Sequence, residues 1–213
     1  MVLKPSSLLQ EKLPQEVRAK LPSFIQADRL TGEPDQDVQL EGSVVFRRGD
    51  TVLRAEWVDY SQSQDHLKAR GQVSINRAGT LYQGPELDLK VNNFEGFFTQ
   101  PIYRFLKNEA YGQASKIEFL DDKRAIVHDA TFTTCQRKPG PSWMPDWVLK
   151  ASRLDINSET NMGQAEGASL RLKDIPILPI PSLSFPLSAE RKSGLLPPVL
   201  GLDNLSRSEE HTS

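Results

Sequence analysis

The chain has 213 residues and a formal net charge of −2, from 26 basic and 28 acidic side chains. A balance this close to neutrality provides no bulk positive field for binding nucleic acid. No run of about 18 apolar residues occurs, so the sequence predicts no transmembrane helix. Hydrophobic residues make up 38% of the chain, which suits a β-rich domain with one good core or two small ones.

The first 21 residues place leucine and valine at spacings of four among charged neighbours, which indicates a modest amphipathic helix. Pro14 interrupts this pattern and Pro22 ends it. We therefore expect residues 1–21 to form a lead-in segment. The apolar core and cleavage site of a signal peptide are not found there, which by itself favours a cytosolic protein.

From Phe24 onward, apolar and polar residues alternate with the two-residue period of half-buried strands. Turn residues separate the alternating runs, as at 48–50, 77–79 and 92–93. The sequence thus predicts an all-β domain over residues 22–175.

The strands also repeat as units of roughly 30 residues, a period typical of stacked architectures. One half-motif, a small residue followed three positions later by an apolar one, begins at Ala27, Ala55, Gly84, Ala114 and Ala151. In each repeat a second half-motif follows the first across a polar turn, and it begins at Glu41, Arg70, Glu95, His128 and Glu166. One unit cannot bury its apolar face alone, so about five repeats should stack into an elongated structure of two sheets with open ends.

One set of alternating apolar residues should line the interior between the two sheets. These residues are Val44, Phe46, Val52, Trp57, Val73, Ile75, Leu87, Leu89, Phe98, Ile117, Phe119 and Phe132. They could form a closed hydrophobic core, or a groove if the sheets splay apart. The sequence leaves both readings open.

The N-terminal edge of the predicted sheets would present unpaired backbone groups to another strand. Its residues are Phe24, Ile25, Gln26, Ala27, Asp28, Arg29 and Leu30. Pro22 and Pro34 flank this edge without entering it, so its donors remain available. The edge is either blunted against aggregation or extended by a partner's strand.

Chemistry-bearing residues are sparse, and we expect no catalytic residue, no cofactor and no metal site. His66, His128 and His211 lie far apart, and no Cys/His set has the spacing of metal ligands. The pairs Asp121–Asp122 and Glu118–Asp121 could be imagined as an acid and a base, but the first reads as a hairpin turn. Cys135, the single cysteine, is either a small buried hydrophobe or half of a disulfide whose partner lies outside this segment.

Residues 176–198 begin with an apolar stretch that contains Pro176, Pro179, Pro181 and Pro186. Each proline removes a backbone donor, so the stretch can be neither a helix nor a central strand. We expect a stiff extended connector, followed by a basic turn at 190–194.

Three motifs occur in a fixed order: ATFTTC at 130–135, EGASLRL at 166–172 and FPLSAERKSGLLPP at 185–198. Together they resemble the LPS-assembly protein LptD family. The resemblance implies a β-jellyroll (OstA-like) periplasmic domain of stacked strands. It also implies that residues 176–201 form a proline-rich junction leading into the first strand of an outer-membrane β-barrel.

The resemblance further implies the function and partners. Lipopolysaccharide would pass with its acyl chains in the interior, arriving from an LptA-like bridge protein docked at residues 24–30. Cys135 would form a disulfide, and an LptE-like plug lipoprotein would act through the barrel. The protein would belong to the cell outer membrane, with this segment in the periplasm. The junction and gate residues would be Arg191, Lys192, Ser193, Gly194, Pro197 and Pro198.

Two other functions remain open at this stage: a stand-alone periplasmic bridge protein of the same group, and a carbohydrate-acting β-solenoid. The basic joint at 191–194 favours the LptD-type assignment over the bridge. We expect the start to be internal to a longer reading frame. Residues 202–213 are expected to be a non-native tail, because 207–213 resembles a translated sequencing adapter.

Overall fold

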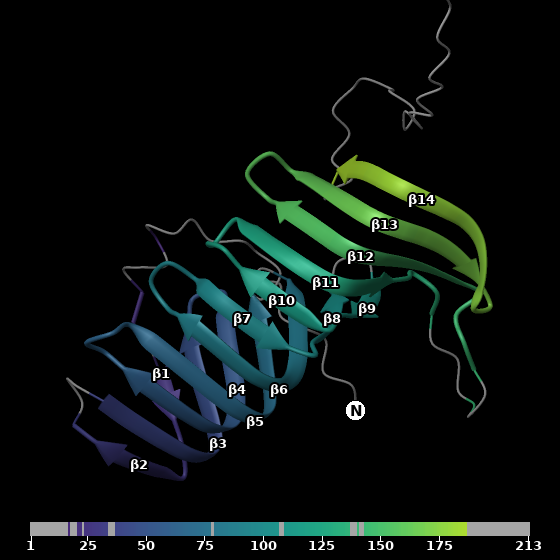
Figure 1. Cartoon of the computed structure of the whole chain (residues 1–213). Helices are drawn as coiled ribbons and strands as arrows, with labels where there is room; N and C mark the ends of the chain where they lie inside the picture. Colours follow the sequence, from purple (N-terminus) through teal and green to yellow (C-terminus); the bar gives the residue numbers. More distant parts are fainter. Residues whose placement is uncertain are drawn as a thin grey trace, which may run out of the picture.

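The computed structural model describes residues 17, 21–22, 24–33, 37–77, 79–106, 109–136, 140 and 143–186. Over these residues, strands follow one another along the molecule from β1 and β2 at one end to β14 at the other (Figure 1), and they pair into a 14-stranded antiparallel sheet. The strands are β1 (Phe24–Gln26), β2 (Arg29–Gly32), β3 (Asp37–Arg48), β4 (Thr51–Ser61), β5 (His66–Arg77), β6 (Thr80–Lys90), β7 (Glu95–Thr99), β8 (Ile102–Phe105), β9 (Tyr111–Gln113), β10 (Lys116–Phe119), β11 (Arg124–Phe132), β12 (Trp147–Asn157), β13 (Met162–Leu172) and β14 (Ile175–Pro186).

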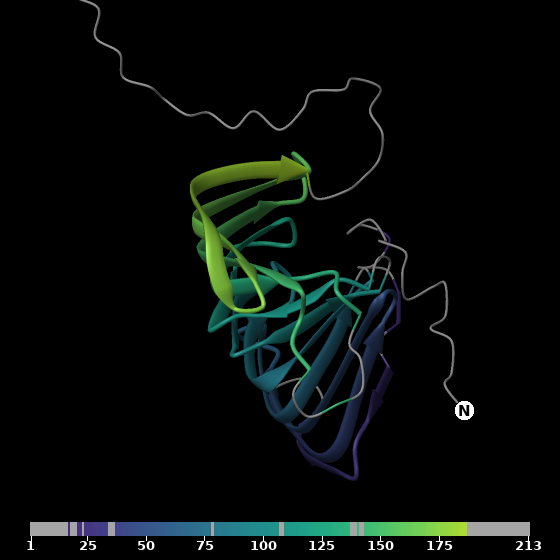
Figure 2. The same ribbon diagram turned by 90° about the vertical axis from the view of Figure 1, so that its right-hand side faces the viewer.

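The long strands bend in the middle, so that each contributes to two facing walls. The first half of β3 pairs with β2 and its second half pairs with β1. In the same way β6 pairs with β8 through its first half and with β7 through its second half. We call the side that contains β1, β8 and β9 the first wall, and the side that contains β2, β7 and β10 the second wall; Figure 2 shows the strands folding over between them.

The half-motifs predicted from the sequence mark these bends. The β3–β4 register shifts between Glu41 and Val44, and the β5 register shifts between Arg70 and Val73. Gly42 and Gly71 lie in the left-handed region there, with φ of 73° and 75°. A Cβ at Gly42 would come within 2.3 Å of an Asp28 carboxylate oxygen. Glycine is therefore required where a bulge bends the strand against an acidic side chain of its neighbour.

One half-motif does not fall at a bend. The run that begins at Glu95 is an ordinary part of β7, and the chain turns instead at Gln100, whose φ is 43°, and at buried Pro101. Strands β7 and β8 are thus the two halves of one bent strand. Proline lacks a backbone N–H, and a residue at a bend does not need one to pair with a neighbouring strand, so Pro101 is tolerated there.

The sheet also extends further than the sequence suggested. Residues 176–186 do not form a connector, because they belong to β14, which pairs with β13 from Leu172 to Met162. The prolines are accommodated because β14 is an edge strand of the sheet formed by the described residues, and backbone donors on an open edge have no ladder partner. The expected gate residues at 191–198, and all of the lead-in segment except Val17 and Leu21, lie outside the described residues. Within the described part, no helix is long and apolar enough to cross a bilayer.

Candidate functional site

The interior of the second wall carries two rows of uncharged, mostly apolar residues, with glycine at three positions of the second row. Strand register sets residues side by side across the whole sheet, and the two-residue period turns alternate rows inward. The row next to the bend is Leu30, Leu40, Val58, Ala69, Leu87, Phe98, Ile117, Val127, Leu154, Ala165 and Leu183. The row beyond it is Gly32, Val38, Tyr60, Leu67, Leu89, Gly96, Phe119, Ala125, Ile156, Gly163 and Phe185. Neither row contains a charged residue.

A matching row faces it from the first wall: Ile25, Phe46, Leu53, Ile75, Tyr82, Tyr103 and Gly112. Beyond β9 an apolar row continues as Phe132, Leu149, Leu170 and Leu178. The two walls therefore enclose an apolar interior that runs from the N-terminal edge strands to β14.

The walls pack tightly in the middle and loosen toward the C-terminal end. Phe98 is 0% exposed and Leu87 is 1% exposed. Over β12–β14 the buried core residues are only alanines, at 151, 165 and 168, while larger side chains such as Leu154 and Phe185 are half-buried. The interior is thus closely packed next to the bend over β3–β11, and an acyl chain could pass along that part only if the walls moved apart.

The predicted lining residues divide into three groups. Eight belong to the buried interior cluster: Val44, Val73, Ile75, Leu87, Leu89, Phe98, Ile117 and Phe119. Phe46 packs against that cluster, and Phe132 lies beside Phe105 and Trp147 at ring-centroid distances of 6.3 and 6.1 Å.

Val52 and Trp57 are not members of the interior cluster, although Val52 is buried at 6% exposed. Each is next in sequence to a cluster residue, Leu53 and Val58, so each faces the opposite side of its strand. Trp57 instead lies 5.4 Å from the guanidinium of Arg70 on the outer face. At both positions the cluster member is the next residue in sequence, so the predicted alternation is displaced by one residue on both sides of the register shift in β4. The prediction also missed interior residues that the cross-strand register reveals: Leu40, Leu53, Val58 and Leu67.

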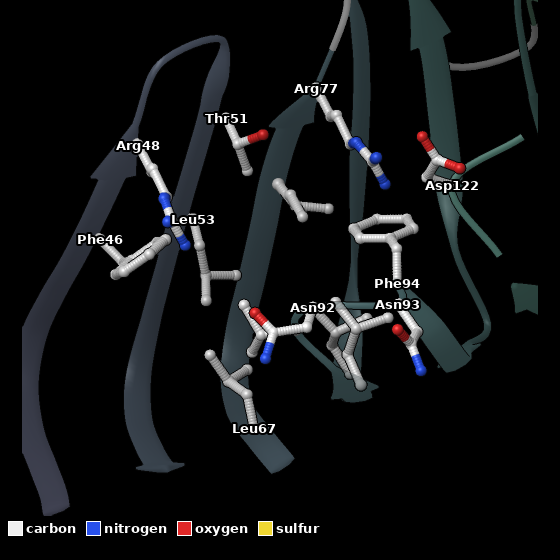
Figure 3. Close-up of a pocket in the computed structure, with 14 residues that line it drawn as sticks. Phe46, Arg48, Thr51, Leu53, Leu67, Arg77, Asn92, Asn93, Phe94 and Asp122 are labelled. Carbon is white, nitrogen blue, oxygen red and sulfur yellow. The ribbon is translucent and has the colours of Figure 1, made fainter. Parts of the chain in front are cut away.

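A cavity of about 270 Å³ opens between the free tips of the two walls (Figure 3). Its inner surface is apolar and includes Phe46, Leu53 and Ile75. Its mouth is polar: the first wall contributes Arg48, Thr51 and Arg77, and the second wall's side contributes Asn92, Asn93 and Asp122. Small-molecule sites typically have volumes of about 300–1,000 Å³, so the cavity is slightly smaller than such a site.

The N-terminal edge strands β1 and β2 expose large apolar side chains. Phe24, Ile25 and Leu30 are 66%, 53% and 56% exposed. The Asp28 backbone N–H donates to the carbonyl oxygen of Gly42 at 3.0 Å, and donors alternate along a strand, so the N–H groups of Arg29 and Thr31 point away from β3.

The first wall has a weak seam between β9 and β11, where one isolated bridge joins Tyr111 to Thr133. The hydroxyl of Tyr103 reaches past Gly112 and donates to the carbonyl oxygen of Thr131. Burial raises the pKa of Tyr103 far above its usual value of 10.0. The hydroxyl therefore stays protonated as a donor that strengthens this seam.

The remaining candidate residues have structural partners. Asp121 caps the β10–β11 turn: its carboxylate accepts from the backbone of Lys123 at 2.8 Å and from Nε of Arg124 at 2.6 Å. Burial raises the pKa of Asp121, but these donors together bring it below its ordinary value. His66 pairs with Asp88 at 2.5 Å, and His128 lies 3.6 Å from Glu118.

Cys135 is a half-exposed free thiol in the described chain, 3.9 Å from the carbonyl oxygen of Trp147. Burial raises its pKa, but hydrogen bonds with the Thr133 side chain and the backbone of 146–147 outweigh that effect and lower it. The thiol therefore has more thiolate character than an ordinary cysteine.

A family model described as "LptA/(LptD N-terminal domain) LPS transport protein" matches residues 24–162. The chain belongs to this family. The resemblance drawn from the three motifs is thereby confirmed, and the match covers β1–β12.

Curated relatives carry the name "LPS-assembly protein LptD". The protein of Albidiferax ferrireducens is 54% identical over 97% of this chain, and that of Acidovorax sp. is 50% identical over 96%. The protein of Burkholderia ambifaria is 38% identical over 91%. The chain spans only 26%, 25% and 24% of their respective lengths.

Among solved structures, LptH of Pseudomonas aeruginosa aligns with a TM-score of 0.30 and 11% identity, over 70% of this chain and 85% of that one. It is described as the LptA-homologous periplasmic component of a lipopolysaccharide transport device. The score is too low for residue-level comparison.

Proposed function

We propose that this chain is a periplasmic segment of an outer-membrane lipopolysaccharide-assembly protein, and that it carries acyl chains between its two walls. The observation that carries the proposal is the pair of uncharged, mostly apolar rows across β2–β14. An ordinary core needs buried side chains, but it does not need an uncharged surface that continues to both edge strands. Membership of the LPS transport family supports lipopolysaccharide as the molecule carried.

In this proposal the lipid enters at the β1–β2 edge, donated by an LptA-like bridge protein whose strand continues the sheet. The exposed donors of Arg29 and Thr31 and the exposed apolar side chains there support that role. The sugars remain outside while the acyl chains move between the walls toward β14, where half-buried side chains line a looser interior. Beyond β14 the chains would reach the barrel, its LptE-like plug and the outer membrane.

Crosslinking probes at residues that face the wall interior can test whether acyl chains pass there. Photo-crosslinking residues are placed at Phe46, Ile75 and Phe119 in the full-length protein in cells, with exposed Gln62 as the control. Lipopolysaccharide should crosslink at the three interior positions and not at Gln62. Absence of crosslinks at all three would mean that the interior is only a core and that this domain acts as a docking scaffold.

A further inference from the structure

Both ends of the sheet are open strand edges that expose apolar side chains. Over the described residues, β1 and β2 form the edge at one end and β14 forms the edge at the other (Figure 1). Phe24 and Leu30 are 66% and 56% exposed at the first end, and Ile175 and Leu178 are 66% and 47% exposed at the second. A second copy of the chain stacked end to end on the first would bury these side chains, so apolar burial by itself favours self-association.

The strands at the two ends run in the same direction across the walls. At the first end the chain passes from β1 in the first wall to β2 in the second wall. Strand β14 does the same, because residues 175–180 continue the first wall and residues 183–186 continue the second. Copies stacked in one orientation would therefore pair β14 with β1 and β2 as parallel strands. The interior row that ends at Leu183 in one copy would then continue from Leu30 in the next.

The strand register shows which backbone nitrogens of β14 face its open side. Directly after β13, the N–H of Lys173 donates to the carbonyl oxygen of Asp146 at 3.1 Å, on the side of β12. N–H groups alternate in direction along a strand, so the N–H of Leu170 points toward β14, where its partner is Leu178. The nitrogen of Leu178 therefore faces β13, and the nitrogens of the alternate residues of β14 face the open side.

In the first half of β14 these alternate residues are all prolines. They are Pro176, Pro179 and Pro181, and Ile177 is the unpaired residue of the register shift between them. Proline has no N–H, and its ring carbon takes the place of the hydrogen, so this edge presents carbonyl oxygens without donors. The side chains of the three prolines are exposed, so they are not needed for packing the interior. The β1–β2 edge differs, because β2 keeps N–H groups that point away from β3.

We propose that Pro176, Pro179 and Pro181 prevent the β14 edge from pairing with the β1–β2 edge of a second copy of this chain. A strand placed against β14 would find no donor for its carbonyl oxygens and would meet the proline rings instead, so the apolar attraction between the ends is opposed. The sheet therefore accepts a strand at its β1–β2 end only. This rests on the proposed function and adds a direction to it, because the end at which acyl chains leave the interior stays free of backbone pairing.

The test measures self-association of the 213-residue chain by sedimentation velocity over a range of concentrations. The triple variant carries Pro176→Thr, Pro179→Thr and Pro181→Thr, which give the edge three N–H donors on residues that favour strands. Pro145→Thr is the matched control, because Pro145 precedes β12 and lies away from the edge. Adding Thr31→Pro to the triple variant removes a donor from the opposite edge. Thermal unfolding of each variant checks that the fold is retained, and Pro179→Thr alone serves if the triple variant unfolds.

We expect the wild-type and Pro145→Thr chains to remain monomers. The triple variant should associate roughly tenfold to 1,000-fold more tightly than the wild type, because each of the new hydrogen bonds strengthens association by roughly twofold to tenfold. Adding Thr31→Pro should weaken that association by about tenfold or more. A triple variant as monomeric as the wild type would overturn the inference. Association that Thr31→Pro leaves unchanged would also overturn it, because the contact would then lie elsewhere, and so would a wild-type chain that already associates through a contact that Thr31→Pro removes. None of these outcomes alters the crosslinks expected in the interior, so the proposed function is decided by its own test.

Discussion

Phe98 gives the most direct test of where the interior lies. It is 0% exposed and sits between Leu87 and Ile117 in the inward row of the second wall. A buried aromatic side chain covers about 150–250 Å², and its truncation leaves a cavity, so Phe98→Ala should cost about 3–5 kcal/mol. At about 2–4 °C per kcal/mol for a domain of this size, the unfolding midpoint should fall by about 6–20 °C.

The neighbouring Phe97 is the matched control. It lies on the outer face of the same strand, half-buried, with the Lys116 ammonium 5.0 Å from its ring. Phe97→Ala should cost only about 1 kcal/mol, because it removes a partly exposed ring and one cation–π contact. Urea and thermal unfolding followed by circular dichroism measure both variants. Equal losses for the two variants would refute the assignment of the inward row, and a small loss at Phe98 would mean that the walls are already apart there.

Three further predictions concern the edge, the seam and the thiol. Thr31→Pro removes an outward backbone N–H donor of β2, so it should weaken binding of an LptA-like bridge protein roughly tenfold in a titration. Thr31→Ala keeps that donor and should bind as the wild type does. Equal effects of the two substitutions would argue against strand addition at this edge. Tyr103→Phe should lower the free energy of unfolding by about 1–2 kcal/mol, with half-buried Tyr60→Phe as the control, because the Thr131 carbonyl loses its donor. The pKa of Tyr103 in the folded state is raised above 10.0, so the stabilisation from its hydroxyl is present below that pH and is lost as the pH rises further. The urea midpoint of the wild type should therefore fall more steeply above pH 10.0 than that of Tyr103→Phe. Parallel curves would contradict this. Cys135 should reach half its maximal alkylation rate by iodoacetamide below pH 9.0, since its pKa is lowered; a midpoint above 9.0 would show that burial dominates.

Much of the architecture could be predicted from the sequence, because strand alternation and bend chemistry are local. The half-motifs that begin at Glu41 and Arg70 mark bends because each contains a glycine in the left-handed conformation, a signal that lies within a few adjacent residues. The bend at Gln100 lacks such a glycine, and its position was missed for that reason. Strand β14 was missed because four prolines argue against a central strand, and the sequence does not show that β14 lies at the edge of the sheet formed by the described residues.

The site was predicted less completely, because inward-facing residues depend on register across strands. Val52 and Leu53 are adjacent, apolar and buried, and only the pairing with the neighbouring strands shows that Leu53 belongs to the interior row. The row of Arg48, Thr51 and Arg77 joins residues from three strands, and no spacing in the sequence signals it. The grouping of these polar side chains around the cavity mouth arises only when the three strands pair, so it cannot be read from the sequence alone.

We propose that one continuous interior carries acyl chains from the edge strands to β14. The decisive measurement compares photo-crosslinking of lipopolysaccharide in cells at inward and outward neighbours on two distant strands of the full-length protein: Ile75 against Ser74 on β5, and Ala165 against Gln164 on β13. The account predicts crosslinks at Ile75 and Ala165 and none at Ser74 or Gln164. Crosslinks confined to β5 would make the cavity a dead end, and crosslinks at both members of each pair would place the lipid outside the walls.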